Sequence, residues 1–461
     1  MEPIEVRSPA NGTLLARVDR DDESSVSRKV EATARAQKQW AALSPMDRAE
    51  RLLAVAADTS AELEQLVVAL VQEQGKTRKE ARMELKRYVG PFIQYAGMAT
   101  GADGQHVDLG GGVEGLVKRR PVGVVAGIVP WNFPASLFGT KLAPALAAGC
   151  GFVVKPAEST SVITRELADI VSRHVPEGLV QVVVGGAEVG DALVRHPSVA
   201  RIAFTGSTAV GKRVGAASGG ELKRVSLELG GCDPFVVLDA VDVRATTRAL
   251  MGTRFYNAGQ VCVAPKRLIA HEAVADELID ALTDRLERIV VGDGLEEGTT
   301  MGPLHTQAGR EHLEQQIEDA VNRGATLVGG GRPDDRATEK GWFLRPALLL
   351  DPQPGARVRQ EETFGPVLSV VRVSDEAEAI AVANETPYGL GASVWGTDHG
   401  AALRVADAMD AGYVWVNTLG RVYDELPFGG VKQSGFGREH GRDALLSYTE
   451  ARTVVQRVPT R

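Results

Sequence analysis

The chain contains 461 residues, more than one compact core usually holds, so at least two domains are expected. Its 44% hydrophobic and 24% charged residues are typical of a globular protein. The formal net charge of -8 argues against nucleic-acid binding, and no run of about 18 apolar residues predicts a membrane span.

The N-terminal segment and the cysteines together predict a cytoplasmic protein. Residues 1–18 carry charges throughout and lack the apolar core of a signal peptide. Cys150, Cys232 and Cys262 are too few for a disulfide framework and odd in number, which favours a reducing compartment. A lone cysteine in such a protein is most often a small buried hydrophobe, and this is the interpretation for Cys150 and Cys232.

The first hundred residues are predicted to be helical. Ser44 and Pro45 suit an N-cap and a first helical residue, and apolar residues then recur at helical spacing from Leu52 to Leu70. The glycine-rich stretch 101–115 leads into an extended segment, 115–120, outside the main core.

From residue 122 onward, apolar strands alternate with helices. Strands are predicted at 122–129, 152–155, 180–184, 201–205 and 225–229, with helices around 136–148, 161–173, 188–195 and 209–217. Such alternation indicates parallel strands joined by crossover helices. A second series of strands follows at 235–238, 267–270, 368–373, 392–395 and 413–416. The sequence therefore predicts two α/β domains, with a boundary after Gly231.

Residues 204–211 lie between a predicted strand and helix, where a dinucleotide-binding turn belongs. Thr208 replaces the middle glycine of the usual fingerprint, so ligand binding and a plain tight turn are equally open on this motif alone. The fingerprint also expects an acidic residue about 20 positions on to hold the ribose, and Glu228 falls there. The surrounding motifs suggest a different role for Glu228.

Seven segments resemble the aldehyde dehydrogenase superfamily in order and spacing, at residues 130–134, 155–158, 204–211, 228–231, 259–262, 362–366 and 427–435. The resemblance covers nearly the whole chain. It implies an α/β fold with a Rossmann-like nucleotide domain of residues 1–101 and 123–231 and a catalytic domain of residues 232–446. A small oligomerisation β-element would comprise residues 102–122 and 447–461, and a homodimer or homotetramer is implied.

The resemblance also assigns the catalytic groups. Cys262 would attack the aldehyde carbonyl, as a thiolate is strongly nucleophilic. The Asn132 amide and the Cys262 main-chain N–H would hold the oxyanion, the alternative for Asn132 being a cap of its own turn. Glu228 would activate the hydrolytic water, the alternative being a helix cap or ion pair. Glu439 resembles a second glutamate used in a proton relay, with a surface ion pair as an equally weighted alternative.

The cofactor implied is NAD, with NADP possible. Lys155, Pro156, Ala157 and Glu158 match the segment that holds the adenosine ribose, and a carboxylate there repels a 2′-phosphate. The remaining expected contacts are Gly206 and Ser207 at the phosphates, Trp131 and Leu229 at the nicotinamide, Glu362 at its ribose, and Phe364 near its ring or simply in the core. The eight histidines show no paired-ligand spacing, so no metal is expected.

The substrate is expected to be a neutral aliphatic or aromatic aldehyde. Related succinate-semialdehyde dehydrogenases carry arginines at two pocket positions where this chain has Thr140 and Tyr256, so both carboxylate anchors are missing. The predicted pocket is lined by Phe133, Leu137, Tyr256, Val261, Val263 and Phe428. Arg421 is either an alternative anchor or, as favoured, solvated.

Three other functions stay open: a succinate-semialdehyde type dehydrogenase, a CoA-acylating dehydrogenase, and a catalytically silent homologue. The CoA-acylating enzymes usually lack a glutamate at the Glu228 position. A silent homologue would have lost Cys262 or its partners, all of which are present.

Overall fold

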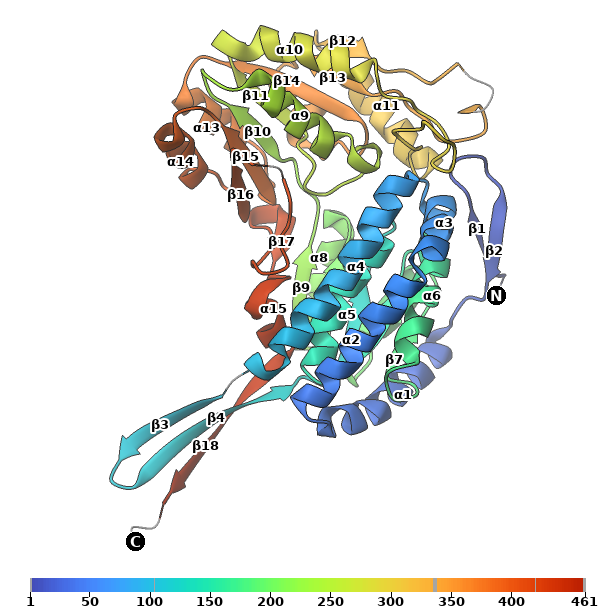
Figure 1. The fold of residues 1–461 in the computed structure, drawn as a ribbon, viewed down its shortest axis with the longest axis vertical. Helices are drawn as coiled ribbons and strands as arrows, with labels where there is room; N and C mark the ends of the chain where they lie inside the picture. The colour runs from blue at the N-terminus through green and yellow to red at the C-terminus, as the bar shows by residue number, and fades with distance from the viewer. Residues whose placement is uncertain (1, 103, 335–337, 419, 459–461) are drawn as a thin grey trace.

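The structure is a computed structural model that describes residues 2–102, 104–334, 338–418 and 420–458. Residues 103 and 459–461 of the predicted oligomerisation element, and Met1, lie outside this range. Helices and parallel sheets build two lobes, with a third small sheet projecting from one of them (Figure 1), so the predicted mixed α/β class is confirmed. None of the described helices is long and apolar enough to cross a membrane.

The N-terminal prediction is wrong over its first residues, which form a hairpin of β1 (Ile4–Arg7) and β2 (Leu14–Val18). The side chains of Ile4 and Val6 are buried while Glu5 and Arg7 are exposed, an alternation with a strand's period of two. Helices follow as predicted: α1 (Glu23–Ala42), α2 (Pro45–Ala61), α3 (Leu63–Gln74) and α4 (Arg78–Met98). Ser44 caps α2 by accepting from the Asp47 N–H, with Pro45 in the first turn.

The first sheet has six strands in the order β17-β9-β8-β5-β6-β7. Its parallel strands are β5 (Val124–Ile128), β6 (Gly151–Lys155), β7 (Val180–Val182), β8 (Val199–Thr205) and β9 (Arg224–Glu228). The connecting helices are α5 (Pro134–Ala147), α6 (Ser161–Ser172), α7 (Ala187–Arg195) and α8 (Thr208–Gly220). These elements overlap every strand and helix predicted for this region.

The second sheet has seven strands in the order β12-β13-β14-β11-β10-β15-β16. It contains the five predicted strands, as β10 (Pro234–Val237), β11 (Arg267–His271), β14 (Val367–Val373), β15 (Gly391–Trp395) and β16 (Tyr413–Val416). The sequence did not reveal the hydrogen-bonded pair β12 (Thr326–Gly329) and β13 (Ala347–Leu350). The helices are α9 (Val243–Arg254), α10 (Glu272–Leu286), α11 (Gln307–Asn322), α12 (Arg357–Gln360), α13 (Glu376–Asn384) and α14 (His399–Asp407).

The chain returns to the first lobe near its C-terminus. Strand β17 (Gly435–Phe436) pairs antiparallel with β9, placing Gly435 opposite Glu228. Helix α15 (Gly441–Ser447) contributes Ala444 and Leu445 to the core around α5. These two elements complete the first lobe although the predicted division counts them with residues 232–446.

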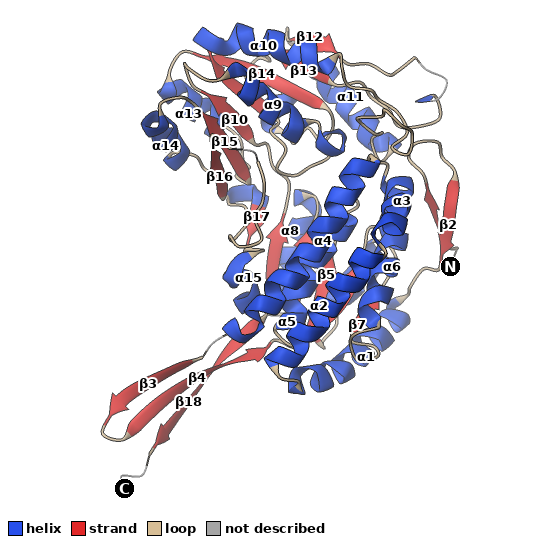
Figure 2. Cartoon of the chain, viewed as in Figure 1, coloured by secondary structure: helices blue, strands red, loops and turns tan. Residues whose placement is uncertain are grey.

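The third sheet is antiparallel and consists of β3 (Gln105–Gly110), β4 (Val113–Pro121) and β18 (Thr449–Arg457). Strands β18 and β4 pair over nine residues each. The sheet extends away from both lobes (Figure 2), and Val107, Leu109 and Val455 on it are exposed.

The relation between the two large sheets positions the site. Trp131 follows β5, Gly206 follows β8 and Leu229 follows β9, so the first sheet contributes the carboxyl ends of its strands. The second sheet contributes segments that precede strands, with Cys262 before β11 and Glu362 before β14. The cleft therefore lies between the carboxyl ends of strands in the first sheet and the amino ends of strands in the second.

Candidate active site

A cleft of about 1340 Å³ lies between the two lobes. It brings together eight of the predicted site residues, namely Trp131, Asn132, Gly206, Ser207, Leu229, Cys262, Glu362 and Phe364. The loop before β15 adds Tyr388, which the sequence did not single out.

The segment before Cys262 has an unusual backbone. Asn257, Ala258 and Gly259 have φ values of 52°, 52° and 73°, three successive residues in the left-handed region. Left-handed geometry costs a non-glycine residue about 1 kcal/mol or more, and such strain concentrates at functional sites. At Gly259 a Cβ atom would also lie 2.3 Å from the Gly365 carbonyl oxygen, so glycine is required there. We call residues 256–262 the nucleophile loop, after the role predicted for Cys262.

Two buried cations hold the nucleophile loop in place. Arg254 donates to the carbonyl oxygens of Gly259 (3.4 Å), Thr363 (3.1 Å) and Gly365, and thus joins the loop to the segment before β14. Lys266 Nζ donates to the carbonyl oxygens of Val261 (2.9 Å) and Cys262. Buried charges are costly unless fully hydrogen-bonded.

Cys262 is partly exposed at the cleft. Burial raises the pKa of its thiol to about 12, with Lys266 opposing the shift and the carboxylates of Glu362, Asp233 and Glu228 adding to it. The thiol is therefore protonated at neutral pH in this state of the site, and a thiolate requires a base or a change in the surrounding charges.

Asn132 is buried where the chain leaves β5 and enters α5. Its Nδ2 donates to the Gln260 carbonyl oxygen at 3.0 Å. The main-chain carbonyl oxygen of Asn132 accepts from Lys76 Nζ (2.9 Å) and Asn257 Nδ2 (3.0 Å). An amide nitrogen carries two N–H groups, so one is left for a ligand in the cleft.

Glu228 is the last residue of β9 and is 4% exposed. Neither of its carboxylate oxygens has a hydrogen-bond partner among the described residues. Burial and the nearby charge of Glu439 raise its pKa well above the ordinary value, while Lys141 and Arg438 oppose the shift. A buried carboxyl with a raised pKa and free oxygens is suited to accept a proton from water.

Glu439 forms a buried ion pair with Lys141 of α5, at 2.5 Å, rather than a surface pair. The same ammonium donates to Thr205 Oγ1 at 2.6 Å. Main-chain hydrogen bonds of 2.7 Å in both directions between Glu439 and Phe428 fix the backbone there. Lys141 was missed at the sequence level, although a lysine within the apolar helix 134–147 is itself an unusual feature.

The nicotinamide side of the predicted cofactor site is aromatic. The Trp131 ring stacks on His305 (centroids 4.5 Å apart) and meets the edge of Phe364 (5.6 Å). Burial lowers the pKa of His305 to about 4, so this ring is neutral. Glu362 accepts from the Gly231 N–H at 3.3 Å, and burial raises its pKa.

The adenosine side is a second pocket of about 940 Å³, lined by Lys155 and Glu158 among others. Ser207 caps α8 by accepting from the Val210 N–H, so the predicted dinucleotide-binding turn leads into the positive end of a helix. Glu158 also lies 3.3 Å from the Arg20 guanidinium. The carbonyl of Pro156 accepts from Lys155 Nζ (3.2 Å), and Ala157 precedes the short helix Glu158–Thr160.

Five of the six residues predicted for the substrate pocket gather in one apolar cluster with Ala264: Phe133, Leu137, Tyr256, Val261 and Val263. The sixth, Phe428, packs separately against Tyr413 and His440. Thr140 is buried. Arg421 is exposed and lies over the Tyr423 ring at 5.0 Å.

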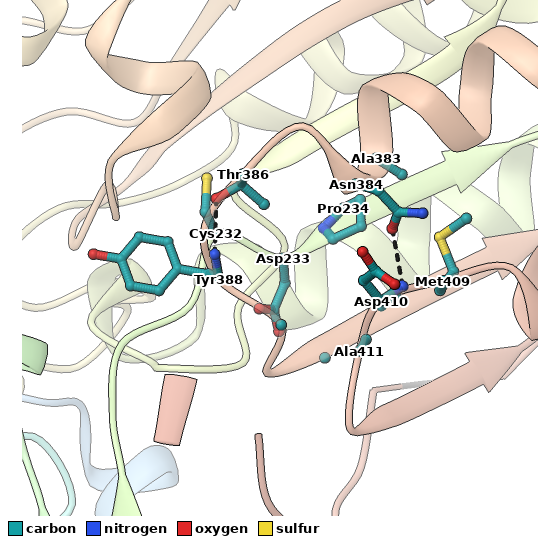
Figure 3. A pocket seen from close by; sticks show the side chains of 13 residues that line it. Cys232, Asp233, Pro234, Ala383, Asn384, Thr386, Tyr388, Met409, Asp410 and Ala411 are labelled. Atoms are coloured by element: carbon teal, nitrogen blue, oxygen red, sulfur yellow. Dashed lines mark hydrogen bonds between the residues drawn. The ribbon is translucent and has the colours of Figure 1, made fainter. Parts of the chain in front are cut away.

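The other two cysteines are buried thiols. Cys150 is fully buried, and burial raises its pKa to about 11. Cys232 is 1% exposed beside Asp233 in a separate pocket of about 230 Å³ (Figure 3), and its Sγ lies 3.7 Å from the Arg359 carbonyl oxygen. Burial raises its pKa too, which makes a reactive thiolate unfavourable at this position.

Known proteins match this chain over nearly its whole length. A sequence model described as the aldehyde dehydrogenase family matches residues 1–454. The chain belongs to the aldehyde dehydrogenase family. The resemblance stated from the sequence is thereby confirmed, and the enzyme is an NAD(P)-dependent oxidoreductase that acts on aldehydes.

Two curated relatives and two solved structures illustrate the similarity. A phenylacetaldehyde dehydrogenase of Pseudomonas fluorescens is 40% identical, over 98% of this chain and 92% of the relative. A betaine aldehyde dehydrogenase of Rhizobium leguminosarum bv. trifolii is 38% identical, over 98% and 93%. The structures of PnpE from Pseudomonas sp. WBC-3 (TM-score 0.97, 38% identity, 100% and 95% covered) and of a putative aldehyde dehydrogenase from Burkholderia cenocepacia (0.97, 36%, 99% and 95%) share the fold.

Among the described residues, no three histidine, cysteine, aspartate or glutamate side chains gather as ligands for a metal ion. The main groups that sequence reasoning missed are the buried charges behind the cleft, namely Lys76, Glu80, Glu84, Lys141, Arg254 and Lys266.

Proposed function

We propose that this aldehyde dehydrogenase oxidises a neutral aldehyde to its acid with NAD, through a thioester on Cys262 that Glu228 helps to hydrolyse. The observation that carries the proposal is the buried Glu228 carboxyl, whose two oxygens have no partner among the described residues. Its charge acts on Cys262, the one cysteine of the three that reaches the cleft.

In the proposed reaction, Glu228 first takes the proton of the Cys262 thiol. The thiolate then attacks the carbonyl carbon and forms the C–S bond, and the carbonyl π electrons move to oxygen. The free N–H of the Asn132 amide and the Cys262 main-chain N–H, which has no acceptor among the described residues, donate to that oxyanion. NAD, when bound, would accept the hydride of the former aldehyde C–H bond. As that C–H bond breaks, the oxyanion electrons re-form the C=O bond and leave a thioester on Cys262.

Hydrolysis then needs a base. Glu228 takes a proton from water, the resulting hydroxide adds to the thioester carbon, and the C–S bond breaks with release of the Cys262 thiolate and the acid. The buried pair of Glu439 and Lys141 lies beside Glu228 and supplies a route for that proton away from the site.

The residues around the two pockets fit a dinucleotide. Ser207 and the start of α8 offer N–H donors for phosphate, and Trp131 with Phe364 offers aromatic surface for a nicotinamide. Solved relatives include PnpE in complex with nicotinamide adenine dinucleotide and a betaine aldehyde dehydrogenase from Staphylococcus aureus in complex with NAD+. Glu158 favours NAD over NADP because its carboxylate repels a 2′-phosphate.

The substrate class follows from the apolar cluster. The Phe133 and Tyr256 rings stack with centroids 5.8 Å apart, and aliphatic side chains surround them. The relative named phenylacetaldehyde dehydrogenase supports an aromatic aldehyde. Initial rates with phenylacetaldehyde, benzaldehyde, hexanal and succinate semialdehyde test this, and a clear preference for the semialdehyde would refute it. If the addition of CoA yields an acyl-CoA product, the acyl group is transferred to CoA instead of water, and the proposed hydrolysis is refuted.

One observation favours a second candidate, an aldehyde with a distal carboxylate. Arg87 of α4 is exposed, forms no ion pair among the described residues, and lies 5.8 Å from the Tyr256 ring centroid. If it anchors a carboxylate, Arg87→Met raises KM for succinate semialdehyde at least about tenfold, as loss of a charged hydrogen bond does, and leaves KM for benzaldehyde unchanged.

We further propose a cytoplasmic homodimer or homotetramer that associates through the projecting sheet of β3, β4 and β18. The outer strands of this sheet, β3 and β18, each have one edge without a partner strand among the described residues. The sheet also exposes the apolar side chains of Val107, Leu109 and Val455, and both features favour pairing with another copy of the chain. The proposed division is a nucleotide domain of residues 1–101 and 123–231, a catalytic domain of residues 232–446, and this element. Light scattering of the full chain and of Val455→Asp tests the assembly.

A further inference from the structure

Behind the Asn132 turn lies an ion pair removed entirely from solvent. Lys76, in the loop between α3 and α4, and Glu84, in α4, each have a side-chain exposure of 0%, and Lys76 Nζ donates to Glu84 Oε2. Burying two charges is expensive, and an ion pair compensates only when further hydrogen bonds satisfy both partners. The remaining partners of this pair all belong to the segment around Asn132.

Both members of the pair bind the chain from the Asn132 carbonyl to the first turn of α5. Lys76 Nζ donates to the Asn132 carbonyl oxygen at 2.9 Å and lies 4.2 Å from the centroid of the Phe133 ring. Glu84 Oε1 accepts from the N–H groups of Ala135 (2.8 Å) and Ser136 (3.3 Å). The residue before α5, Phe133, provides no side-chain cap, so Glu84 of another helix serves as the cap of α5.

Helix α4, which carries Glu84, also contacts the nucleophile loop. Glu80 Oε1 accepts from the Asn257 N–H at 2.7 Å, and Asn257 Nδ2 donates to the Asn132 carbonyl oxygen at 3.0 Å. The first turns of α4 therefore contact both segments whose donors would surround an oxyanion, the one ending in Asn132 and the one ending in Cys262.

We propose that the Lys76–Glu84 ion pair is a positioning device for the oxyanion site. It fixes the main chain at the Asn132 carbonyl and at the start of α5, directly after it, and so directs the Asn132 amide toward the cleft. This inference rests on the proposed role of Asn132 as an oxyanion donor. Misplacement of a catalytic donor by a fraction of an ångström reduces turnover far more than substrate or cofactor binding.

The test is a double-mutant cycle on kcat between Lys76→Met and Asn132→Ala. If Lys76 acts through Asn132, Lys76→Met lowers kcat about 10- to 100-fold in the wild-type background and less than about twofold in the Asn132→Ala background. The Kd for NAD, measured by titration, stays within about threefold of wild type throughout. An equal loss of kcat in both backgrounds would overturn the inference.

Two further variants separate positioning from general destabilisation. Arg48 is a matched control, because it donates to the Ala147 carbonyl oxygen (3.1 Å) at the opposite end of α5. Arg48→Met lowers Tm but leaves kcat within about twofold of wild type, and a kcat loss matching that of Lys76→Met would also overturn the inference. Should Lys76→Met not fold, Lys76→Met/Glu84→Gln, which leaves no unpaired charge, takes its place in the cycle.

The proposed function fails in a different way. If Asn132→Ala itself retains wild-type kcat, Asn132 is no oxyanion donor and the mechanism is refuted. The cycle then refutes this inference as well, since no effect is left for Lys76 to act through. If Asn132→Ala loses turnover but Lys76→Met does not, the mechanism stands and only the positioning role falls.

Discussion

The buried Glu228 carboxyl is predicted to make the protein less stable, with a definite dependence on pH. Burial and the charge of Glu439 raise its folded-state pKa above the ordinary value of 4.5. The folded chain is therefore penalised for ionising Glu228. That penalty is absent below the unfolded-state pKa, grows as pH rises through the interval between the two pKa values, and is complete above the folded-state pKa.

Glu228→Gln removes the titration while keeping the side chain's shape, so the variant lacks this penalty. An uncompensated buried charge costs roughly 3–5 kcal/mol. Lys141 opposes the pKa shift and offsets part of that cost, which leaves a gain of about 2 kcal/mol for the variant at pH 8.5 and a Tm higher by a few degrees. At pH 4.5 the gain is expected to vanish.

Thermal unfolding of wild type and Glu228→Gln from pH 4.5 to 9, without cofactor, measures this difference. Glu439→Gln is the matched control, because Glu439 is equally buried at 4% but is paired with Lys141, so its loss lowers Tm. A Glu228→Gln variant no more stable than wild type at pH 8.5, or most stabilised at low pH, would refute the reasoning.

Further outcomes are expected at the same site. Cys262→Ala keeps NAD binding in a titration but loses at least about 1000-fold in kcat; residual turnover above that level would exclude Cys262 as nucleophile. Glu439→Gln removes a like charge beside Glu228, so the acid limb of the kcat–pH profile moves to lower pH, and a move to higher pH would contradict this assignment. Gly259→Ala places a methyl group 2.3 Å from the Gly365 oxygen at a φ of 73°; it lowers Tm, and an unchanged Tm would contradict the geometry.

Much of this arrangement was accessible from the sequence because period and spacing are local properties. Apolar runs between helical stretches marked five strands in each of the two large sheets, and the position of Glu228 at a strand end followed directly from them. The hairpin at residues 4–18 was missed because its two strands are short and precede a long helical stretch. Strand β12 was missed because an exposed edge strand lacks an apolar face.

The groups that the sequence did not reveal are long-range partners. Lys141 and Glu439 are 298 positions apart, and no periodicity links them. Lys76 stands in a loop between helices, where a lysine is ordinarily solvated, so its burial depends on the packing of α4 against α5. Arg20, which pairs with Glu158, is another long-range partner to which nothing in the fingerprint points.

The partners of the buried charged side chains suggest why the site contains so many of them, although selection for stability alone would not favour buried charges. Seven charged side chains around the cleft are at most 4% exposed: Lys76, Glu84, Lys141, Glu228, Arg254, Lys266 and Glu439. Replacing buried ion pairs by apolar groups is often neutral or stabilising, so packing does not require them. Six of the seven bond to the Asn132 segment, the nucleophile loop or each other, and the seventh, Glu228, has free oxygens. Asp233, 3% exposed in the neighbouring pocket, also has carboxylate oxygens without a partner among the described residues. The six bonded side chains therefore make the site around Glu228 rigid and leave its carboxyl free to react.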